Sequence, residues 1–226
     1  MAPERQGRLA RVVEHAPDTR SLFLRLPAGE RLVFRPGQFI SCLLPVNGET
    51  LTRPYSLASS PEDEELEICL NLVEGGRGSR HLLGLPVGAA VRFTGPWGTF
   101  VLDRAPEAEA VFIADGTGIA PIRPMLRRAL ATATRHPLRL LHGADGERGL
   151  LYRAELEALA REHDRFTFEQ VARAELAAEV ARRWVDADAD RSRRFFICGI
   201  GDVVPTLRDL LRRAGYERRA VQYERW

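Results

Sequence analysis

The chain has 226 residues, of which 45% are hydrophobic and 28% charged, as is typical of a globular protein with one large or two modest domains. Its net charge of +2 excludes a bulk electrostatic attraction to nucleic acid. Its three cysteines, Cys42, Cys69 and Cys198, are too few and too far apart for a disulfide framework, a Cys-x-x-Cys metal site or a four-cysteine iron–sulfur centre. We therefore expect no bound metal, a reducing cytoplasmic setting and, because no apolar run is long enough to cross a bilayer, no membrane insertion.

The first part of the chain, residues 1–103, is predicted to be an antiparallel Greek-key β-barrel. Short strand-like runs alternate there with turn residues such as Pro36-Gly37 and Gly95-Pro96. The spacing also predicts a short helix from Ser79 to Leu83, with Ser79 as its N-cap. The expected strands are Arg8–Glu14, Ser21–Leu26, Gln38–Leu44, Pro54–Ala58, Leu66–Val73 and Ala90–Phe93.

The second part, residues 104–226, is predicted to be an α/β domain with an open parallel sheet. The polar stretch Arg104-Ala105-Pro106-Glu107 marks the boundary, after which strands and helices alternate. Such sheets bind ligands at the carboxyl ends of their strands. The expected strands are Val111–Ala114, Leu138–Leu141, Phe166–Val171, Phe195–Cys198 and Ala220–Tyr223, and the expected helices Pro121–Leu130, Leu151–Arg161, Ala174–Val185 and Val203–Arg213.

The stretch Arg53-Pro54-Tyr55-Ser56 combines a guanidinium, a rigid bend, an aromatic ring and a hydroxyl. A guanidinium pairs with phosphate in a fixed fork geometry, and a tyrosine ring stacks on planar heterocycles. The stretch therefore has the groups needed for a flat, phosphate-bearing cofactor. By itself it is equally compatible with an ordinary strand after a proline turn.

Two glycine-rich loops are candidate phosphate sites. Gly116-Thr117-Gly118-Ile119-Ala120-Pro121 follows an apolar strand and opens a helix, where free N–H groups and the helix dipole favour an anion. Gly75-Gly76-Arg77-Gly78-Ser79 also precedes a helical segment. The alternatives are a tight strand-to-helix turn without a ligand and a plain hairpin loop.

Two further segments stand near strand ends. Cys198-Gly199 follows the apolar strand Phe195-Phe196-Ile197, where the cysteine either meets a ligand or fills the core. The chain ends in Glu224-Arg225-Trp226, and its terminal indole either covers a flat cofactor or is simply a docked end.

Together these segments resemble the ferredoxin–NADP+ reductase superfamily through nearly the whole chain. Arg53-x-Tyr55-Ser56 resembles its flavin motif, and Gly76-Arg77-Gly78-Ser79 its pyrophosphate motif. Gly116 to Pro121 is similar to its nicotinamide-dinucleotide loop, and Glu224-Arg225-Trp226 to the Glu-x-aromatic ending of ferredoxin and flavodoxin reductases. Other similar segments are Gly95-Pro96-Trp97-Gly98-Thr99-Phe100, Leu150-Leu151-Tyr152-Arg153-Ala154-Glu155-Leu156 and Cys198-Gly199.

The resemblance implies that FAD is the cofactor. Arg53 is expected to pair with the FAD pyrophosphate, Tyr55 to stack on the isoalloxazine and Ser56 to hydrogen-bond near the flavin N5. Trp226 is expected to cover the other flavin face. The full set of implied FAD contacts is Arg53, Pro54, Tyr55, Ser56, Leu70, Leu72, Gly76, Arg77, Gly78, Ser79 and Trp226.

The resemblance also implies that NADP(H) is the substrate, with NADH as an alternative. The implied dinucleotide contacts are Gly116, Thr117, Gly118, Arg173, Cys198 and Gly199. The implied catalytic residues are Ser56, Cys198, Glu224 and Trp226.

Three residues depart from the family's pattern. Asp115 precedes the Gly-Thr-Gly loop, so its carboxylate either points away from the pyrophosphate or weakens its binding. Ala172 replaces a serine beside Arg173 in the expected 2′-phosphate site, where Arg182 or Arg183 is a second candidate cation. Asp145 stands where many relatives have an arginine. Arg173 favours NADPH over NADH because a guanidinium binds phosphate in a bidentate way.

The leading functional hypothesis is a monomeric reductase that passes electrons between NADPH and ferredoxin or flavodoxin. The alternatives are the NADH- or NADPH-dependent reductase component of a multicomponent oxygenase, and a flavin-bearing electron-transfer subunit of a larger complex. Acidic carriers of this kind are expected to dock near arginines such as Arg77, Arg80 and Arg225.

Overall fold

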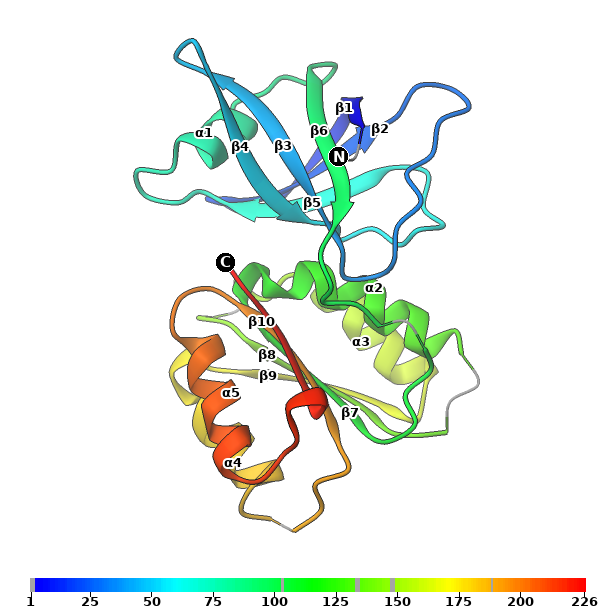
Figure 1. Ribbon diagram of the computed structural model, residues 1–226, viewed down its shortest axis with the longest axis vertical. Helices are drawn as coiled ribbons and strands as arrows, with labels where there is room; N and C mark the ends of the chain where they lie inside the picture. The colour runs from blue at the N-terminus through cyan, green and yellow to red at the C-terminus, as the bar shows by residue number, and fades with distance from the viewer. Residues whose placement is uncertain (1–2, 103, 133–134, 147–148, 188) are drawn as a thin grey trace. The chain divides into compact units, whose positions relative to one another are not determined.

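The computed structural model describes residues 3–102, 104–132, 135–146, 149–187 and 189–226. The chain forms two compact units, Met1–Asp103 with Arg123–Met125, and Arg104–Ile122 with Leu126–Trp226. Each unit has its own sheet, antiparallel in the first and parallel in the second (Figure 1). The predicted fold class, an antiparallel barrel followed by an open parallel α/β sheet, is confirmed.

The sheet of the first unit has six strands in the order β4-β3-β6-β1-β2-β5. Its two outer strands are joined through a bridge between Leu57 and Ile68, next to the hydrogen bond from the Ala58 N–H to the Glu67 carbonyl (2.8 Å). The bridge brings the two ends of the sheet together into a barrel. The strands are β1 (Glu4–Ala16), β2 (Thr19–Arg25), β3 (Phe39–Val46), β4 (Glu49–Ser56), β5 (Leu66–Asn71) and β6 (Ala90–Trp97), and the one helix among the described residues of this barrel is α1 (Arg77–Leu83).

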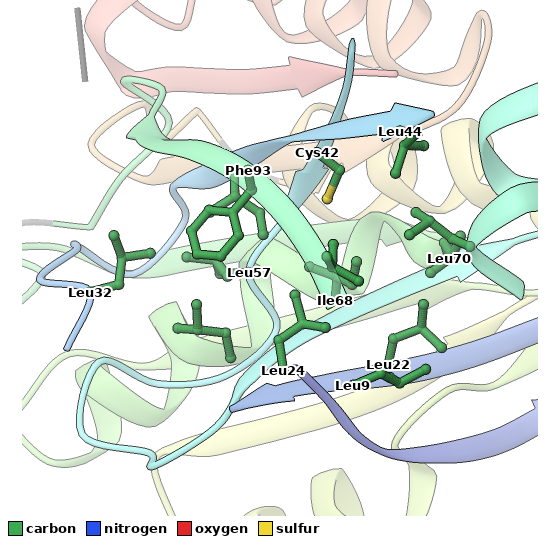
Figure 2. Packing of buried hydrophobic residues seen from close by; sticks show 14 of the residues in the cluster. Leu9, Leu22, Leu24, Leu32, Cys42, Leu44, Leu57, Ile68, Leu70 and Phe93 are labelled. Carbon is green, nitrogen blue, oxygen red and sulfur yellow. The ribbon is translucent and has the colours of Figure 1, made fainter. Parts of the chain in front are cut away.

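The barrel interior is filled by aliphatic side chains and one large ring. In Figure 2, Leu22 and Leu24 of β2, Ile68 of β5 and Phe93 of β6 point toward one another, and all four are at most 1% exposed. Burial of this apolar surface stabilises the barrel by roughly 25 cal/mol per Å² removed from water.

Two local predictions in the first unit were wrong. Helix α1 begins at Arg77 with Gly76 as its N-cap, so Ser79 lies inside the first turn and is not the cap. Strand β4 begins at Glu49 and contains Pro54, whereas the proline was expected to start the strand. Strand β4 pairs along its length with β3 alone, and a proline is tolerated in a strand of this kind because one side of its backbone needs no N–H donor.

The sheet of the second unit has five parallel strands in the order β11-β10-β7-β8-β9. Its strands are β7 (Ala110–Asp115), β8 (Leu138–Gly143), β9 (Phe166–Val171), β10 (Arg194–Gly199) and β11 (Val221–Arg225). Its helices are α2 (Ile119–Leu130), α3 (Arg153–Glu162), α4 (Leu176–Trp184) and α5 (Val203–Arg213), with short 3₁₀ turns at Gly116–Gly118, Arg173–Glu175 and Arg218–Ala220.

The helices of this unit cover both faces of its sheet (Figure 1). One face buries Val180 of α4 and Leu207 of α5 in the same apolar cluster as Phe195 and Ile197 of β10. Strand β7 is buried at every position, as expected for a central parallel strand. Strand β8 runs two residues beyond its predicted end, which places His142 beside Ala114 of β7.

Among the residues that the structure describes, no helix is both long and apolar enough to cross a membrane.

Candidate functional site

The predicted flavin motif at residues 53–56 and the glycine-rich loop at residues 75–79 lie next to each other in the first unit. A Cβ added to Gly78 of α1 would lie 2.9 Å from the Arg53 Cγ and 3.4 Å from the Tyr55 hydroxyl. Only glycine therefore lets α1 approach the end of β4 this closely. The two segments were predicted separately from the sequence, and the fold brings them together.

Arg53 presents an exposed guanidinium at this point. Its Nη1 donates to the Thr52 carbonyl at 2.8 Å, and within the described part of the chain it has no carboxylate partner. The neighbouring Arg77, by contrast, lies 3.4 Å from a carboxylate oxygen of Glu49. A guanidinium has five N–H donors, so Arg53 retains donors that suit an anionic group of a ligand.

Tyr55 lies half-buried at the edge of the barrel core. Burial, assisted by the nearby Cys42 and opposed by Arg53, raises the pKa of Tyr55 to about 12. This shift reinforces the neutrality that a phenol already has near pH 7, and the ring can stack on a flat heterocycle. Ser56 ends the strand, is 7% exposed and pairs in register with Phe39.

The remaining predicted flavin contacts have mixed surroundings. The Ser79 Oγ accepts the Val73 N–H at 3.2 Å and donates to the Gly76 carbonyl at 3.4 Å, so it ties the glycine loop together from inside the helix. Leu70 is 4% exposed in the barrel core, whereas Leu72 is 42% exposed beyond the end of β5. The roles of these residues toward FAD stay predictions.

In the second unit, the glycine-rich loop that begins with Gly116–Gly118 lies against the end of β10. A Cβ added to Gly118 would lie 2.1 Å from the Cys198 carbonyl oxygen, a distance that no side chain can occupy. Strands β7 and β10 are neighbours here, and the chain leaves β7 toward β8 on the other side. This is the topological switch point of the sheet, where open α/β sheets bind ligands.

Asp115 ends β7 directly before this loop, and its side chain is almost wholly buried. The Nε of Arg173 donates to its Oδ1 at 2.5 Å, and a Cβ added to Gly199 would lie 2.7 Å from the Asp115 Cβ. A buried carboxylate is expensive unless it is paired, and Arg173 provides the pair. Sequence reasoning singled out both residues but did not foresee that they pair.

The pair with Asp115 thus holds Arg173 next to Gly116, the first residue of the glycine loop 116–118. A Cβ on Gly116 would lie 2.9 Å from its Nη2, and its Nη1 lies 3.7 Å from an Asp145 carboxylate oxygen. Gly116 has a φ of +54°, a conformation that favours glycine.

His142 is a residue of this site that sequence reasoning missed. It is 0% exposed, and its Nε2 lies 3.0 Å from the Gly116 carbonyl oxygen. Because a carbonyl oxygen can only accept a hydrogen bond, the ring must carry a hydrogen on Nε2 to form it. Its Nδ1 is buried and has no hydrogen-bond partner within the described residues. Burial lowers the pKa of His142 to about 4, opposed by the bond to Gly116. Aligning the ends of β7 and β8 would have placed it here.

The predicted nicotinamide-pocket residues gather beside the same loop. Cys198 is 1% exposed and pairs in register with Glu224 of β11, and the backbone N–H of Trp226 donates to the Gly199 carbonyl at 3.2 Å. Burial, followed by the Glu224 carboxylate, raises the pKa of the Cys198 thiol, while a hydrogen bond with Trp226 acts in the opposite direction. Burial therefore disfavours the thiolate form of Cys198.

The predicted dinucleotide residues thus lie together at one edge of the sheet, around the loop 116–118, where a Cβ on Gly118 would overlap the Cys198 carbonyl. Thr117 is in the 3₁₀ turn between Gly116 and Gly118. Of the predicted catalytic residues, Ser56 belongs to the first unit and Cys198, Glu224 and Trp226 to the second. Their joint action on one cofactor stays a prediction.

Replacing Gly118 by alanine is expected to destabilise the second unit by roughly 1–3 kcal/mol, because the new methyl group would overlap the Cys198 carbonyl. Urea unfolding followed by circular dichroism measures the change. Thr117→Ala, which removes atoms from the adjacent position, is the matched control. An unchanged urea midpoint for Gly118→Ala would contradict this account of the loop.

His142 is expected to make stability depend on pH. Its folded pKa of about 4 lies below the unfolded value of 6.5, so between these values the unfolded chain binds the proton first. The free energy of unfolding should therefore fall by up to about 3 kcal/mol as the pH drops from 6.5 to 4.

The variant His142→Gln keeps an N–H donor for Gly116 and does not titrate, so its unfolding free energy should vary less over this range. Replacing the exposed His136 by glutamine is the matched control. Urea unfolding at a series of pH values tests the prediction, and equal slopes for the wild type and His142→Gln would refute it.

Comparison with known proteins identifies the family. Residues 6–102 match the oxidoreductase FAD-binding domain model, and residues 112–200 match the oxidoreductase NAD-binding domain model. The ferredoxin–NADP reductase B of Sorangium cellulosum is 35% identical, over 98% of this chain and 97% of its own length.

Other relatives belong to oxygenase systems. A Ralstonia ferredoxin–NAD(P)+ reductase component of naphthalene 1,2-dioxygenase and salicylate 5-hydroxylase systems is 33% identical over 69% of this chain, which spans 46% of that protein. A cytochrome P450 reductase from Amycolatopsis has a similar structure, with a TM-score of 0.85 and 28% identity, covering 100% of this chain and 71% of its own.

A Neisseria gonorrhoeae ferredoxin–NADP+ reductase, solved with FAD and NADP, shares the fold with a TM-score of 0.81 and 22% identity, over 100% of this chain and 99% of its own. The two family models, the whole-chain relative and the two-unit fold agree. The chain therefore belongs to the ferredoxin–NADP+ reductase family and is a flavin-dependent oxidoreductase with an FAD-binding and an NAD(P)-binding domain.

Proposed function

We propose that this protein is a ferredoxin reductase, which transfers electrons between a nicotinamide dinucleotide and ferredoxin, or a flavodoxin in its place. The observation that carries the proposal is the 35% identity to the Sorangium ferredoxin–NADP reductase over nearly the full length of both chains. Residues 1–103 would form the FAD-binding domain and residues 104–226 the dinucleotide-binding domain. FAD, when bound, accepts two electrons from a nicotinamide and releases them singly to a carrier.

The residues of this chain supply binding and orientation. Arg53 would bind the FAD pyrophosphate with donors that no carboxylate within the described residues engages, and Gly78 leaves room for α1 beside it. Tyr55 offers a neutral ring for stacking. In the second domain, the backbone of Gly116–Gly118 would receive the dinucleotide pyrophosphate, and Cys198 would contribute a small, uncharged wall to the nicotinamide pocket.

A second candidate is the reductase component of an oxygenase. It is supported by several relatives named as such, including an aromatic O-demethylase reductase subunit from Amycolatopsis that is 38% identical over 70% of this chain. The two functions share the flavin and nicotinamide chemistry and differ in the electron acceptor. Steady-state turnover with a purified [2Fe–2S] ferredoxin, compared with turnover with an oxygenase component, separates them.

Anaerobic mixing of the FAD-loaded protein with NADPH or NADH is expected to bleach the visible absorbance of the oxidised flavin, because the cofactor carries the redox chemistry. The bleached protein should then reduce added ferredoxin with the stoichiometry of one electron per carrier. Absence of bleaching with both nucleotides would sink the reductase proposal and favour a subunit that receives electrons elsewhere.

Replacing Arg53 by alanine is expected to weaken FAD binding by roughly 10- to 100-fold, because a charge-assisted hydrogen bond contributes about 1.5–3 kcal/mol. The flavin-to-protein ratio after gel filtration and fluorescence titration of the apoprotein measure the change. Arg92→Ala, which removes a surface arginine paired with Glu4, is the matched control. Equal FAD affinity in the two variants would remove Arg53 from the site.

A further inference from the structure

The cations expected to recognise the 2′-phosphate of NADP(H) are all engaged by carboxylates. Arg183 contacts both oxygens of Glu169, at 2.6 and 2.8 Å, and also Glu179 at 2.8 Å. Arg182 lies 2.6 Å from Glu179. The third cation, Arg173, is the one beside the glycine loop, and it is held by Asp115.

The pair of Asp115 with Arg173 is not an ordinary surface ion pair. The Asp115 side chain is 3% exposed and that of Arg173 is 43% exposed, so the buried carboxylate depends on the guanidinium for compensation. Asp115 is also confined by Gly199, where even a methyl group would overlap its Cβ. Surface pairs contribute little and exchange easily, whereas breaking a pair with a buried member leaves a buried charge uncompensated.

The charge around Arg173 is also unfavourable for a phosphate. Asp145 lies 3.7 Å away on the solvent side, so one cation faces two carboxylates. A phosphate monoester brings close to two further negative charges at pH 7. Because the Nε of Arg173 is held by Asp115 and its Nη1 lies near Asp145, a phosphate would have to share one guanidinium with two like charges.

We propose that Asp115 is a specificity-determining residue, which holds Arg173 at the glycine loop and thereby keeps it from the 2′-phosphate, so that the protein discriminates only weakly between NADP(H) and NAD(H). The inference rests on the proposed binding of a nicotinamide dinucleotide at Gly116–Gly118. NADP(H) and NAD(H) differ only in the 2′-phosphate, so the difference in affinity between them reports on that contact alone.

The test uses the FAD-loaded protein and two probes, 2′,5′-ADP and 5′-ADP, with dissociation constants from calorimetry. The quantity of interest is the preference, defined as the affinity for 2′,5′-ADP divided by that for 5′-ADP. Asp115→Asn keeps the shape of the side chain and removes its charge, and is expected to raise the preference about tenfold, as one released charge-assisted hydrogen bond allows.

The double variant Asp115→Asn with Arg173→Ala should lose this gain, because the gain belongs to the released guanidinium. The double variant is preferred to Arg173→Ala alone, which would leave the Asp115 charge buried and unpaired. Asp145→Asn, at an exposed site that tolerates change, should raise the preference by a smaller factor, about two- to fivefold. Glu217→Gln, which removes an exposed partner of Arg219, is the matched control and should change nothing.

The outcomes separate the proposals. An unchanged preference in both Asp115→Asn and Asp145→Asn overturns the inference, as does a gain that survives in the double variant. If Asp115→Asn strengthens both nucleotides equally, Asp115 acts on the pyrophosphate and the inference is also overturned. If the wild type retains FAD but binds neither probe, the proposed dinucleotide site itself is wrong, and the inference falls with it. Should Asp115→Asn fail to fold, the response of Asp145→Asn decides.

Discussion

The close approach of Gly118 to the Cys198 carbonyl is the constraint on which the loop of the proposed dinucleotide site depends. Neighbouring parallel strands are held at a fixed separation by their hydrogen bonds, so a loop that crosses the end of one strand toward the other has little room. At this crossing even a methyl group on residue 118 would overlap the carbonyl. The missing side chain therefore lets the loop turn beside β10 and present its backbone to the ligand edge of the sheet.

The polar groups around that crossing follow from it. Because Asp115 lies directly before the loop, its side chain is enclosed by Gly199 and the adjoining strands, and a carboxylate in that position needs a cation. Arg173, at the end of β9, reaches it. His142 is enclosed on the other side and holds the Gly116 carbonyl. Two titratable side chains are thus buried beside this crossing, and each has a defined hydrogen-bond partner.

Much of the architecture was predictable because it rests on local patterns. The buried run Val111–Ala114 and the alternation of strands and helices after it predicted the parallel sheet, and turn residues between short apolar runs predicted the barrel. The N-cap predicted at Ser79 was wrong because the helix has its cap three residues earlier, at Gly76, and the Ser79 hydroxyl bonds back to Val73 and Gly76. Glycines 76 and 78 allow that earlier start.

The composition of the site was predictable to a similar degree, but its pairings were not. Arg53, Tyr55 and Gly78 were identified from sequence, and they do lie together. Which carboxylate Arg173 contacts depends on distances across three strands, and a single sequence does not contain them. His142 escaped notice because a histidine at the end of an apolar strand has no local signature, and its role appears only when β7 and β8 are aligned in register.

The outer position of β4 in the barrel has a consequence for the behaviour of the protein in concentrated solution. The bridge at Leu57 closes the barrel at the end of β4, so the part of the strand before it is the part that could accept a strand from another chain, which is the first step of edge-to-edge aggregation. The proline at 54 removes a donor from that strand, and the arginine at 53 adds an exposed charge. Residues predicted to hold a cofactor therefore also disfavour strand addition, and the missing donor at Pro54 does so whether or not the cofactor is bound.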